Sequence, residues 1–149
     1  MLSFVTKHFD QLSINELYEI LALRAEVFVV EQNCPYQDLD GKDKKAIHVL
    51  GMQNNHIVAY ARILENGMVY KNYSAIGRIV THNSIRGKGY GDHLVRSAIE
   101  ATKSSFPSTP IKISAQAHLE KFYNGLGFIF TGEAYLEDNI PHIGMVLKD

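Results

Sequence analysis

The first apolar pattern in the chain is that of an amphipathic helix. Its apolar face comprises Leu17, Ile20, Leu21, Val27 and Phe28. Just before it, Ser13 and Glu16 form a Ser-x-x-Glu pattern, in which each side chain can bond the backbone amide of the other residue. These signals predict a helix over residues 15–30. The polar stretch 33–45 that follows predicts a loop, and its charged part, residues 40–45, is expected to be solvated.

Short apolar runs bounded by turn residues predict the strands. They cover residues 4–9, 47–52, 57–64, 75–81, 111–115, 128–133 and 143–147. Helical spacing returns after residue 90, and a shorter helix over residues 119–126 ends at Gly127. The order of elements is strand, helix, antiparallel run, helix, strand, helix and strand pair. This order predicts a mixed α/β fold with a largely antiparallel sheet.

Length and composition fit a single folded domain. The chain has 149 residues, and domains cluster at roughly 100–150 residues, so we predict one domain over residues 1–149. Hydrophobic residues make up 46% and charged residues 21%, which argues against disorder. The net charge of -1 gives no electrostatic basis for general binding of nucleic acid.

Nothing in the apolar pattern predicts an association with membranes. The first eight residues lack the charged segment and apolar core of a signal peptide, and no apolar run approaches the roughly 20 residues that span a bilayer. Cys34 is the only cysteine, and in a predicted loop without an activating partner it is expected to be structural. We therefore expect a cytoplasmic protein. The seven histidines show no metal-ligand spacing, so no metal is expected.

Three glycines alternate between a predicted strand and the second long helix, in the segment Arg86-Gly87-Lys88-Gly89-Tyr90-Gly91. Such a turn presents successive backbone N–H groups at a helix N-terminus, which is a ready anion site. Arg86 and Lys88 add positive charge, and the alternative is a tight turn with no ligand. The third glycine of a dinucleotide fingerprint would fall at Asp92, and no Walker A string occurs, so neither of those phosphate motifs fits.

The pattern Arg-x-x-Gly-x-Gly, read from Arg86 to Gly91, resembles the pyrophosphate-binding motif of the GNAT acetyltransferases, which use acetyl-CoA. The segment 122–128, Phe-Tyr-Asn-Gly-Leu-Gly-Phe, resembles the signature that follows the fifth strand of that family. Segments 23–40 and 135–145 are similar to the ElaA-type branch of the family. The resemblance covers nearly the whole chain.

This resemblance implies a fold, an activity and a co-substrate. The fold is a single GNAT (acyl-CoA N-acyltransferase) domain, with a central, mostly antiparallel sheet flanked by helices. The activity is acetyl-CoA-dependent N-acetyl transfer to a primary amine, by direct attack of the amine in a ternary complex. The acceptor, a small-molecule or peptide amine, stays open, as does the choice between monomer and homodimer. Because the attack is direct, no protein nucleophile is expected.

The same resemblance assigns roles to individual residues. Backbone amides of the glycine turn hold the CoA pyrophosphate, at Arg86, Gly87, Lys88, Gly89, Tyr90 and Gly91. The backbone around Ile79 and Val80 aligns the pantetheine arm and polarises the acetyl carbonyl. Tyr123 stands where the family often places the general acid for the departing thiolate, and the alternative is a core tyrosine beside Phe122.

Polar residues are weighed for the acceptor side of the reaction. Glu31, at the end of the first helix, is a candidate base or amine-binding group, and the alternative is a surface charge. His142 has the right pKa range for a base, and the alternative is a hydrogen-bonded structural histidine. Together with Glu31, Asp38 and Asp40 favour a cationic acceptor.

Two other functions stay open at this point. Acyl-homoserine-lactone synthases also carry an Arg-x-x-Val-Phe pattern like that of residues 24–28. The glycine turn and the short chain favour acetyl transfer over that reaction. The second alternative is a non-catalytic CoA-binding or sensing module, against which the presence of Tyr123 argues.

Overall fold

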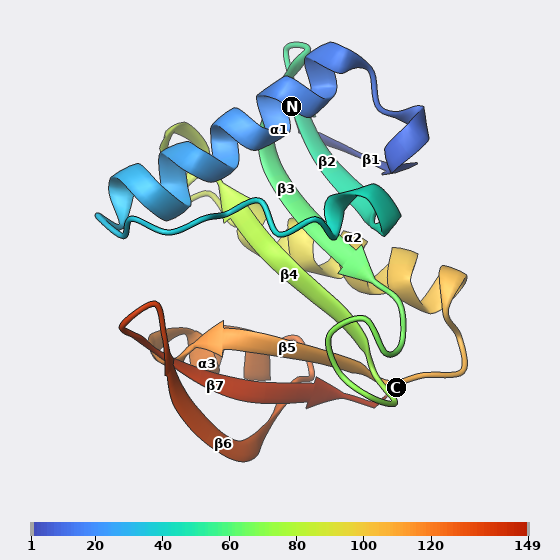
Figure 1. Ribbon diagram of the computed structural model, residues 1–149, viewed down its shortest axis with the longest axis vertical. Coiled ribbons are helices and arrows are strands. Elements are labelled where there is room, and N and C mark those ends of the chain that lie inside the picture. The colour runs from blue at the N-terminus through green and yellow to red at the C-terminus, as the bar shows by residue number, and fades with distance from the viewer. Residues whose placement is uncertain (1, 149) are drawn as a thin grey trace.

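The computed structural model describes residues 2–148, which form one seven-stranded sheet with helices on both faces (Figure 1). The strands are β1 (Ser3–His8), β2 (Ile47–Gln53), β3 (His56–Leu64), β4 (Ser74–Thr81), β5 (Ile111–Gln116), β6 (Ile129–Glu137) and β7 (Ile140–Leu147). Their order across the sheet is β1-β2-β3-β4-β5-β7-β6. Neighbouring strands are antiparallel except β4 and β5, which are parallel. The predicted α/β fold with a largely antiparallel sheet is confirmed.

The helices are α1 (Ile14–Arg24), α2 (Tyr90–Ser105) and the short α3 (Glu120–Asn124). The first begins as its capping box predicts: the hydroxyl of Ser13 accepts from the amide of Glu16 at 3.0 Å, and the Glu16 carboxylate accepts from the amide of Ser13 at 2.8 Å. The prediction of one regular helix through residue 30 is wrong in its second half. The α-helix ends at Arg24, and the chain continues as a π-helix over Ala25–Glu31. Such segments are rare and frequently lie at functional sites.

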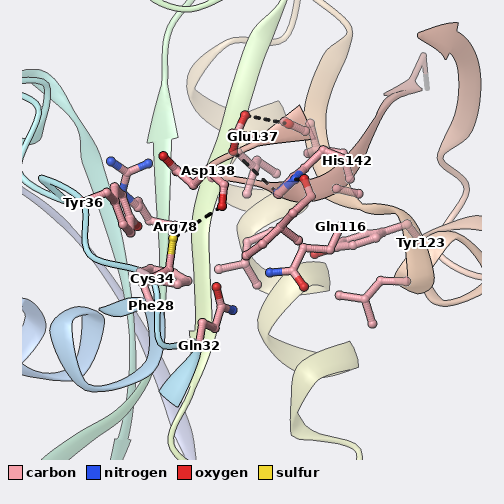
Figure 2. Close-up of a pocket in the computed structure, with 18 residues that line it drawn as sticks. Phe28, Gln32, Cys34, Tyr36, Arg78, Gln116, Tyr123, Glu137, Asp138 and His142 are labelled. Carbon is pink, nitrogen blue, oxygen red and sulfur yellow. Dashed lines mark hydrogen bonds and ion pairs between the residues drawn. The ribbon is translucent and has the colours of Figure 1, made fainter. Parts of the chain in front are cut away.

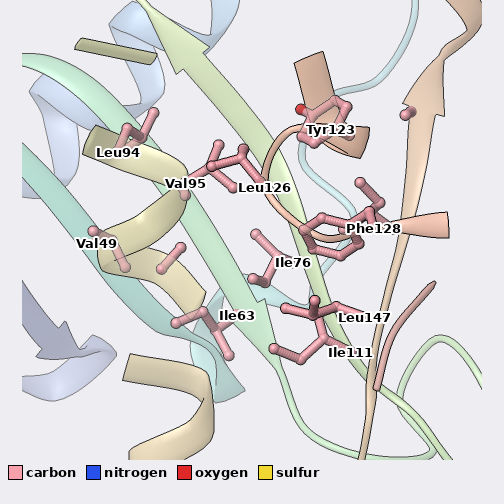
Figure 3. Close-up of a cluster of buried hydrophobic side chains, with 14 of the residues drawn as sticks. Val49, Ile63, Ile76, Leu94, Val95, Ile111, Tyr123, Leu126, Phe128 and Leu147 are labelled. Atoms are coloured by element: carbon pink, nitrogen blue, oxygen red, sulfur yellow. The ribbon is translucent and has the colours of Figure 1, made fainter. Parts of the chain in front are cut away.

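The two long helices cover opposite faces of the sheet (Figure 1). Successive strand residues point to opposite faces. Val49 of β2 therefore belongs to the buried cluster that contains Leu94 of α2, whereas Leu50 belongs to the cluster that contains Ile20 of α1. Figure 3 shows the cluster on the α2 side, whose members include Val49 and Phe128. The centre of the sheet is thus buried on both faces. Strand β4 takes part through Ile76 on the α2 side and Val80 on the α1 side.

Strands β4 and β5 are joined only at their first residues. Within the described strands their ladder has two pairs, Ser74 with Ile111 and Ala75 with Lys112. A hydrogen bond of 2.6 Å between the hydroxyls of Ser74 and Thr109 fastens this end. Beyond it the two strands diverge (Figure 1), which leaves the facing edge of β4 without a ladder partner from β5.

Buried ion pairs hold part of the loop between the π-helix and β2. The prediction of a solvated segment over residues 40–45 is therefore wrong for Asp43, which is buried, whereas Lys44 and Lys45 are exposed as expected. Asp43 accepts from Arg24 at 2.7 Å and from Arg62 at 3.0 Å. Asp40 accepts from both terminal nitrogens of Arg62, at 2.9 and 2.8 Å. Although burial by itself raises the pKa of the Asp43 carboxyl, hydrogen bonds and charge interactions with the two arginines hold that pKa below its usual range. The bonds of Asp40 and Asp43 to Arg62 therefore hold the loop against β3.

Candidate active site

A cavity of about 140 Å³ lies where β4 and β5 diverge (Figure 2). The two strands contribute residues 76–79 and 113–116 to its wall. The rest of the wall comes from the π-helix, the following loop, α3 and the β6–β7 hairpin, and includes Phe28, Cys34, Tyr36, Tyr123, Glu137 and His142. The fold thus brings two of the candidate catalytic residues, Tyr123 and His142, to one opening.

The β4 wall of this cavity contains a β-bulge. In the ladder with β3, the pairing passes from Val80 to Gly77 while the partner strand advances by only two residues. Arg78 within this step has a φ of 49°, which is uncommon for a residue with a side chain. A bulge leaves its extra residue out of the ladder and turns the strand. Ile79 therefore lies at the cavity beside a break in the ladder, whereas Val80 is paired in the ladder and buried on the α1 side.

The glycine turn follows β4 and ends at the N-terminus of α2. Gly87 and Gly89 have φ values of 78° and 82°, a left-handed conformation that favours glycine, and a Cβ at either position would meet no protein atom within 4 Å. Gly89 is the N-cap of α2 and has no side chain to accept from the first-turn amides. Lys88 is exposed beside it, and Tyr90 and Gly91 begin the helix. Open amides at the positive end of a long helix form an anion site.

Two other parts of the chain bind the guanidinium of Arg86. Its Nε and Nη2 donate to the carbonyl oxygen of Thr81 at 3.1 and 2.7 Å, and its Nη1 donates to the Glu31 carboxylate at 2.7 Å. Glu31 thus ties the end of the π-helix to the glycine turn, and it is outside the wall of the cavity. An anion in this turn would therefore depend on the backbone amides, with Arg86 holding the turn in position.

Tyr123 on α3 reaches the cavity and is only 5% exposed. Its ring packs edge-on against Phe122 and Phe128, with centroid distances of 5.0 and 5.9 Å. Burial raises the pKa of its hydroxyl to about 12, so this group is protonated at neutral pH. Tyr123 therefore combines core packing with a proton available at the cavity.

His142 on β7 presents a hydrogen-bond acceptor to the cavity. Its Nδ1 lies 2.7 Å from the carbonyl oxygen of Ile140, which can only accept, so in the neutral ring Nδ1 carries the proton and Nε2 carries the lone pair. Nε2 lies 3.6 Å from a carboxylate oxygen of Glu137, and the ring stacks on Tyr135 with a centroid distance of 6.4 Å. The hydrogen bond from Nδ1 to Ile140 favours the tautomer in which Nε2 can accept a proton, as a general base requires.

Glu137 is the site residue that the sequence analysis missed. It lies at the end of β6, and the antiparallel register pairs it with Ile140 of β7, two residues before His142. The one signal in the sequence was an acidic residue and a histidine on either side of a predicted tight turn. Only the pairing of the two strands brings their side chains together.

Asp38 and Asp40 are bound by arginines, so they do not supply free negative charge for an acceptor. Asp38 accepts from Nε of Arg24 at 2.8 Å and lies 2.7 Å from Nε of Arg78. Asp40 forms ion pairs with Arg62 at 2.8 Å and with Arg78 at 3.5 Å. Although burial by itself raises the pKa of Asp40, its bonds to Arg62 hold that pKa well below its usual range. These two carboxylates therefore give no support to the prediction of a cationic acceptor.

Cys34 lies in the cavity wall, where its Sγ donates to the carbonyl oxygen of Asp138 at 3.5 Å. This contact joins the loop after the π-helix to the turn between β6 and β7. Among residues 2–148, the histidine, cysteine, aspartate and glutamate side chains form no group of three or more that could hold a metal ion. In the same part of the chain, none of the helices has the length and apolar character needed to cross a membrane.

Comparison with known proteins identifies the family. The family described as "Acetyltransferase (GNAT) domain" matches residues 10–148. Protein ElaA of Escherichia coli K12 is 44% identical over 147 residues, which cover 97% of this chain and 95% of that protein. The chain belongs to the GNAT acetyltransferase family.

Solved structures place this GNAT chain among the ElaA-like members. An acyl-CoA N-acyltransferase from Pseudomonas aeruginosa superposes with a TM-score of 0.93 at 42% identity, over 99% of both chains. The crystal structure of Escherichia coli ElaA superposes with a TM-score of 0.92 at 43% identity, over 99% of this chain and 100% of that one. The resemblance read from the sequence is confirmed, and the protein is a GNAT acyltransferase with a single acyl-CoA N-acyltransferase fold.

Proposed function

We propose that this GNAT protein transfers the acetyl group of acetyl-CoA to a primary amine, by direct attack of the amine in a ternary complex. The observation that carries the proposal is the position of Tyr123 and His142, which reach one cavity from α3 and β7, opposite the bulge of β4 (Figure 2). Amide formation from a thioester uses a proton acceptor for the amine and a proton donor for the thiolate. This cavity offers both.

The donor is proposed to bind along β4 and the glycine turn. Backbone amides from Gly87 to Gly91 take the pyrophosphate, because they lie open at the N-terminus of α2. The pantetheine arm carries amide groups of its own, and these pair with the edge of β4 that β5 leaves free. At the bulge around Ile79, the backbone polarises the acetyl carbonyl.

The chain's own side chains then move the protons. A free alkyl amine has a pKa near ~10.4, so it arrives as an ammonium ion. Nε2 of His142 accepts one proton, and the neutral nitrogen attacks the thioester carbon to form the new N–C bond. When the C–S bond breaks, Tyr123 donates its hydroxyl proton to the thiolate and is restored by the second proton of the attacking nitrogen. The products are the N-acetylated amine, the CoA thiol and one proton released from His142.

Two measurements on the same protein test this proposal. Isothermal titration with acetyl-CoA should show binding, and a thiol-release assay should show turnover that depends on an added primary amine, with the acetylated product identified by mass. Binding without turnover for any amine would favour the sensing module. Turnover only with an acylated carrier protein as donor would favour an acyl-homoserine-lactone-type reaction.

A further inference from the structure

We infer that the acceptor of this site is a cationic, unbranched primary amine, whose ammonium group is bound by Glu137 beside His142. This inference rests on the proposed function, because it names the substrate class of the same cavity. Glu137 lies in the cavity wall, with Oε2 at 3.6 Å from Nε2 of His142 (Figure 2). Neither the glycine turn nor the donor path involves this carboxylate.

The charges in the wall leave the acceptor side of the cavity negative. Arg78 lines the cavity, but the aspartates of the loop already compensate its charge. Among residues 2–148, no lysine or arginine forms an ion pair with Glu137 or Asp138, which also line the cavity. The Glu137 carboxylate accepts a hydrogen bond of 3.2 Å from the hydroxyl of Ser114. Two uncompensated carboxylates attract a cation and repel an acceptor that carries its own carboxylate near the reacting nitrogen.

The pair Glu137–His142 has the spacing to hold one ammonium nitrogen. Because the carboxylate oxygen and Nε2 are 3.6 Å apart, a single nitrogen can lie about 2.8 Å from both. The side chain of Glu137 is 51% exposed and that of His142 is 9% exposed, so the carboxylate stands at the entrance and the imidazole lies deeper. A primary ammonium can donate one hydrogen bond to each. When its proton passes to His142, the amine is still held by Glu137 with its lone pair free for attack.

The size and lining of the cavity limit the rest of the acceptor. A volume of about 140 Å³ compares with the roughly 150 Å³ that holds one benzene molecule. The same space also admits the acetyl end of the donor, so only a narrow end of the acceptor can enter. Phe28 and Tyr36 give the wall an aromatic side, which fits a methylene chain. An amine on an unbranched carbon chain meets these limits, whereas an amine on a branched or carboxylate-bearing carbon does not.

The test compares three acceptors and three variants in the thiol-release assay. The acceptors are n-butylamine, which is cationic; 2,2,2-trifluoroethylamine, which is uncharged at neutral pH; and glycine, whose amine adjoins a carboxylate. Glu137→Gln should raise the KM for n-butylamine by about 10-fold or more, and leave the KM for trifluoroethylamine within about twofold of wild type. The KM for acetyl-CoA should not change, because the donor path does not include Glu137.

Glu133→Gln is the matched control. It makes the same substitution on the same strand, but Glu133 lies outside the cavity wall and pairs with Lys112 at 2.8 Å. Its kinetics should equal those of wild type. Glu137→Asp keeps the charge and should recover part of the affinity for n-butylamine. This variant also tests the inference if Glu137→Gln does not fold.

The outcomes distinguish a failure of this inference from a failure of the proposed function. An unchanged KM for n-butylamine in folded Glu137→Gln, or equal use of glycine and n-butylamine by wild type, would overturn the recognition of a cation while acetyl transfer stands. If wild type binds acetyl-CoA and acetylates other primary amines but none of these three, the inference fails and the proposed function stands; if it acetylates no primary amine at all, both fail.

Discussion

At the level of single residues, the neighbours of a polar side chain decide what it can do. Tyr123 is protonated at neutral pH, as any tyrosine is, and burial raises its pKa further, to about 12. His142 keeps a lone pair toward the cavity because its other nitrogen donates to the carbonyl of Ile140. Glu31 has no such freedom, because its carboxylate already binds Arg86. The three residues that the sequence offered as catalytic candidates therefore differ in the chemistry that their surroundings allow.

Removing only the hydroxyl of Tyr123 should slow turnover without disturbing the fold. Tyr123→Phe keeps the ring that packs between Phe122 and Phe128. General acid catalysis contributes about 10²–10⁴-fold, and we expect the low end because a thiolate is a moderately good leaving group. Steady-state kinetics should show the fall in kcat, while a titration with acetyl-CoA shows unchanged affinity. A wild-type kcat in this variant would remove Tyr123 from the mechanism.

Substituting the two candidate bases should separate their roles. His142→Gln removes the proton acceptor at the cavity and should lower kcat by about 10²-fold or more. Glu31→Gln breaks an exposed ion pair, and such pairs contribute about 0–1 kcal/mol, so kcat should stay within about threefold of wild type. Both rates are measured at saturating acetyl-CoA and amine. The reverse ranking would make Glu31 the base and His142 a structural residue.

At the level of elements, local patterns predicted most of the fold, and non-local contacts shaped most of the site. The capping box at Ser13 and the apolar periodicity after it gave the start of α1 correctly. The π-helix from Ala25 has the same apolar spacing as an α-helix, so the sequence carries no sign of it. The sequence did not indicate the bulge at Arg78 either, because nothing in it predicts a φ of 49° at a residue with a side chain. The sequence did not identify Glu137, because its position beside His142 depends on the register of β6 and β7.

The glycine turn offers a test with an internal control for backbone strain. Gly89 and Gly67 both have positive φ, of 82° and 90°, and a Cβ at either meets no protein atom within 4 Å. An alanine at either position should therefore destabilise the fold by a similar amount, roughly 1–2 kcal/mol. Only Gly89→Ala should also weaken acetyl-CoA binding, by about 10-fold, because its methyl group enters the space proposed for the pyrophosphate. Equal affinity of the two variants in calorimetric titration would argue against this turn as the donor site.

At the level of the whole molecule, the site depends on two features. Strands β4 and β5 diverge, and a network of ion pairs holds one edge of the cavity between them. The two-pair ladder between β4 and β5 lets their far ends separate. Arg24 of α1 and Arg62 of β3 are 0% and 4% exposed, and both bind Asp43 of the loop. Arg78 of the cavity wall joins the same network through Asp38. The network therefore links α1, β3, β4 and the loop around one edge of the cavity.

Removing the charge of Asp43 should destabilise the protein in a pH-dependent way. Breaking one partner of a buried pair costs about 3–5 kcal/mol, so Asp43→Asn should lower the free energy of unfolding by about that amount at pH 7. The pKa of Asp43 is lowered in the folded protein from its ordinary 3.8. Its charge therefore contributes stability that is fully present above that value and is lost as the pH falls below it, toward the folded pKa. Urea unfolding curves of both proteins should accordingly converge in that acidic range.

The exposed pair of Asp92 with Arg96 at 2.8 Å provides the control for that pH series. Asp92→Asn should change the free energy of unfolding by about 0.5 kcal/mol or less at every pH, because both partners stay solvated. If Asp43→Asn were no more costly than this control, the network would not be what holds the loop. The fixed edge of the cavity would then have to come from apolar packing on the α1 side, where Ile20 and Val80 share a buried cluster.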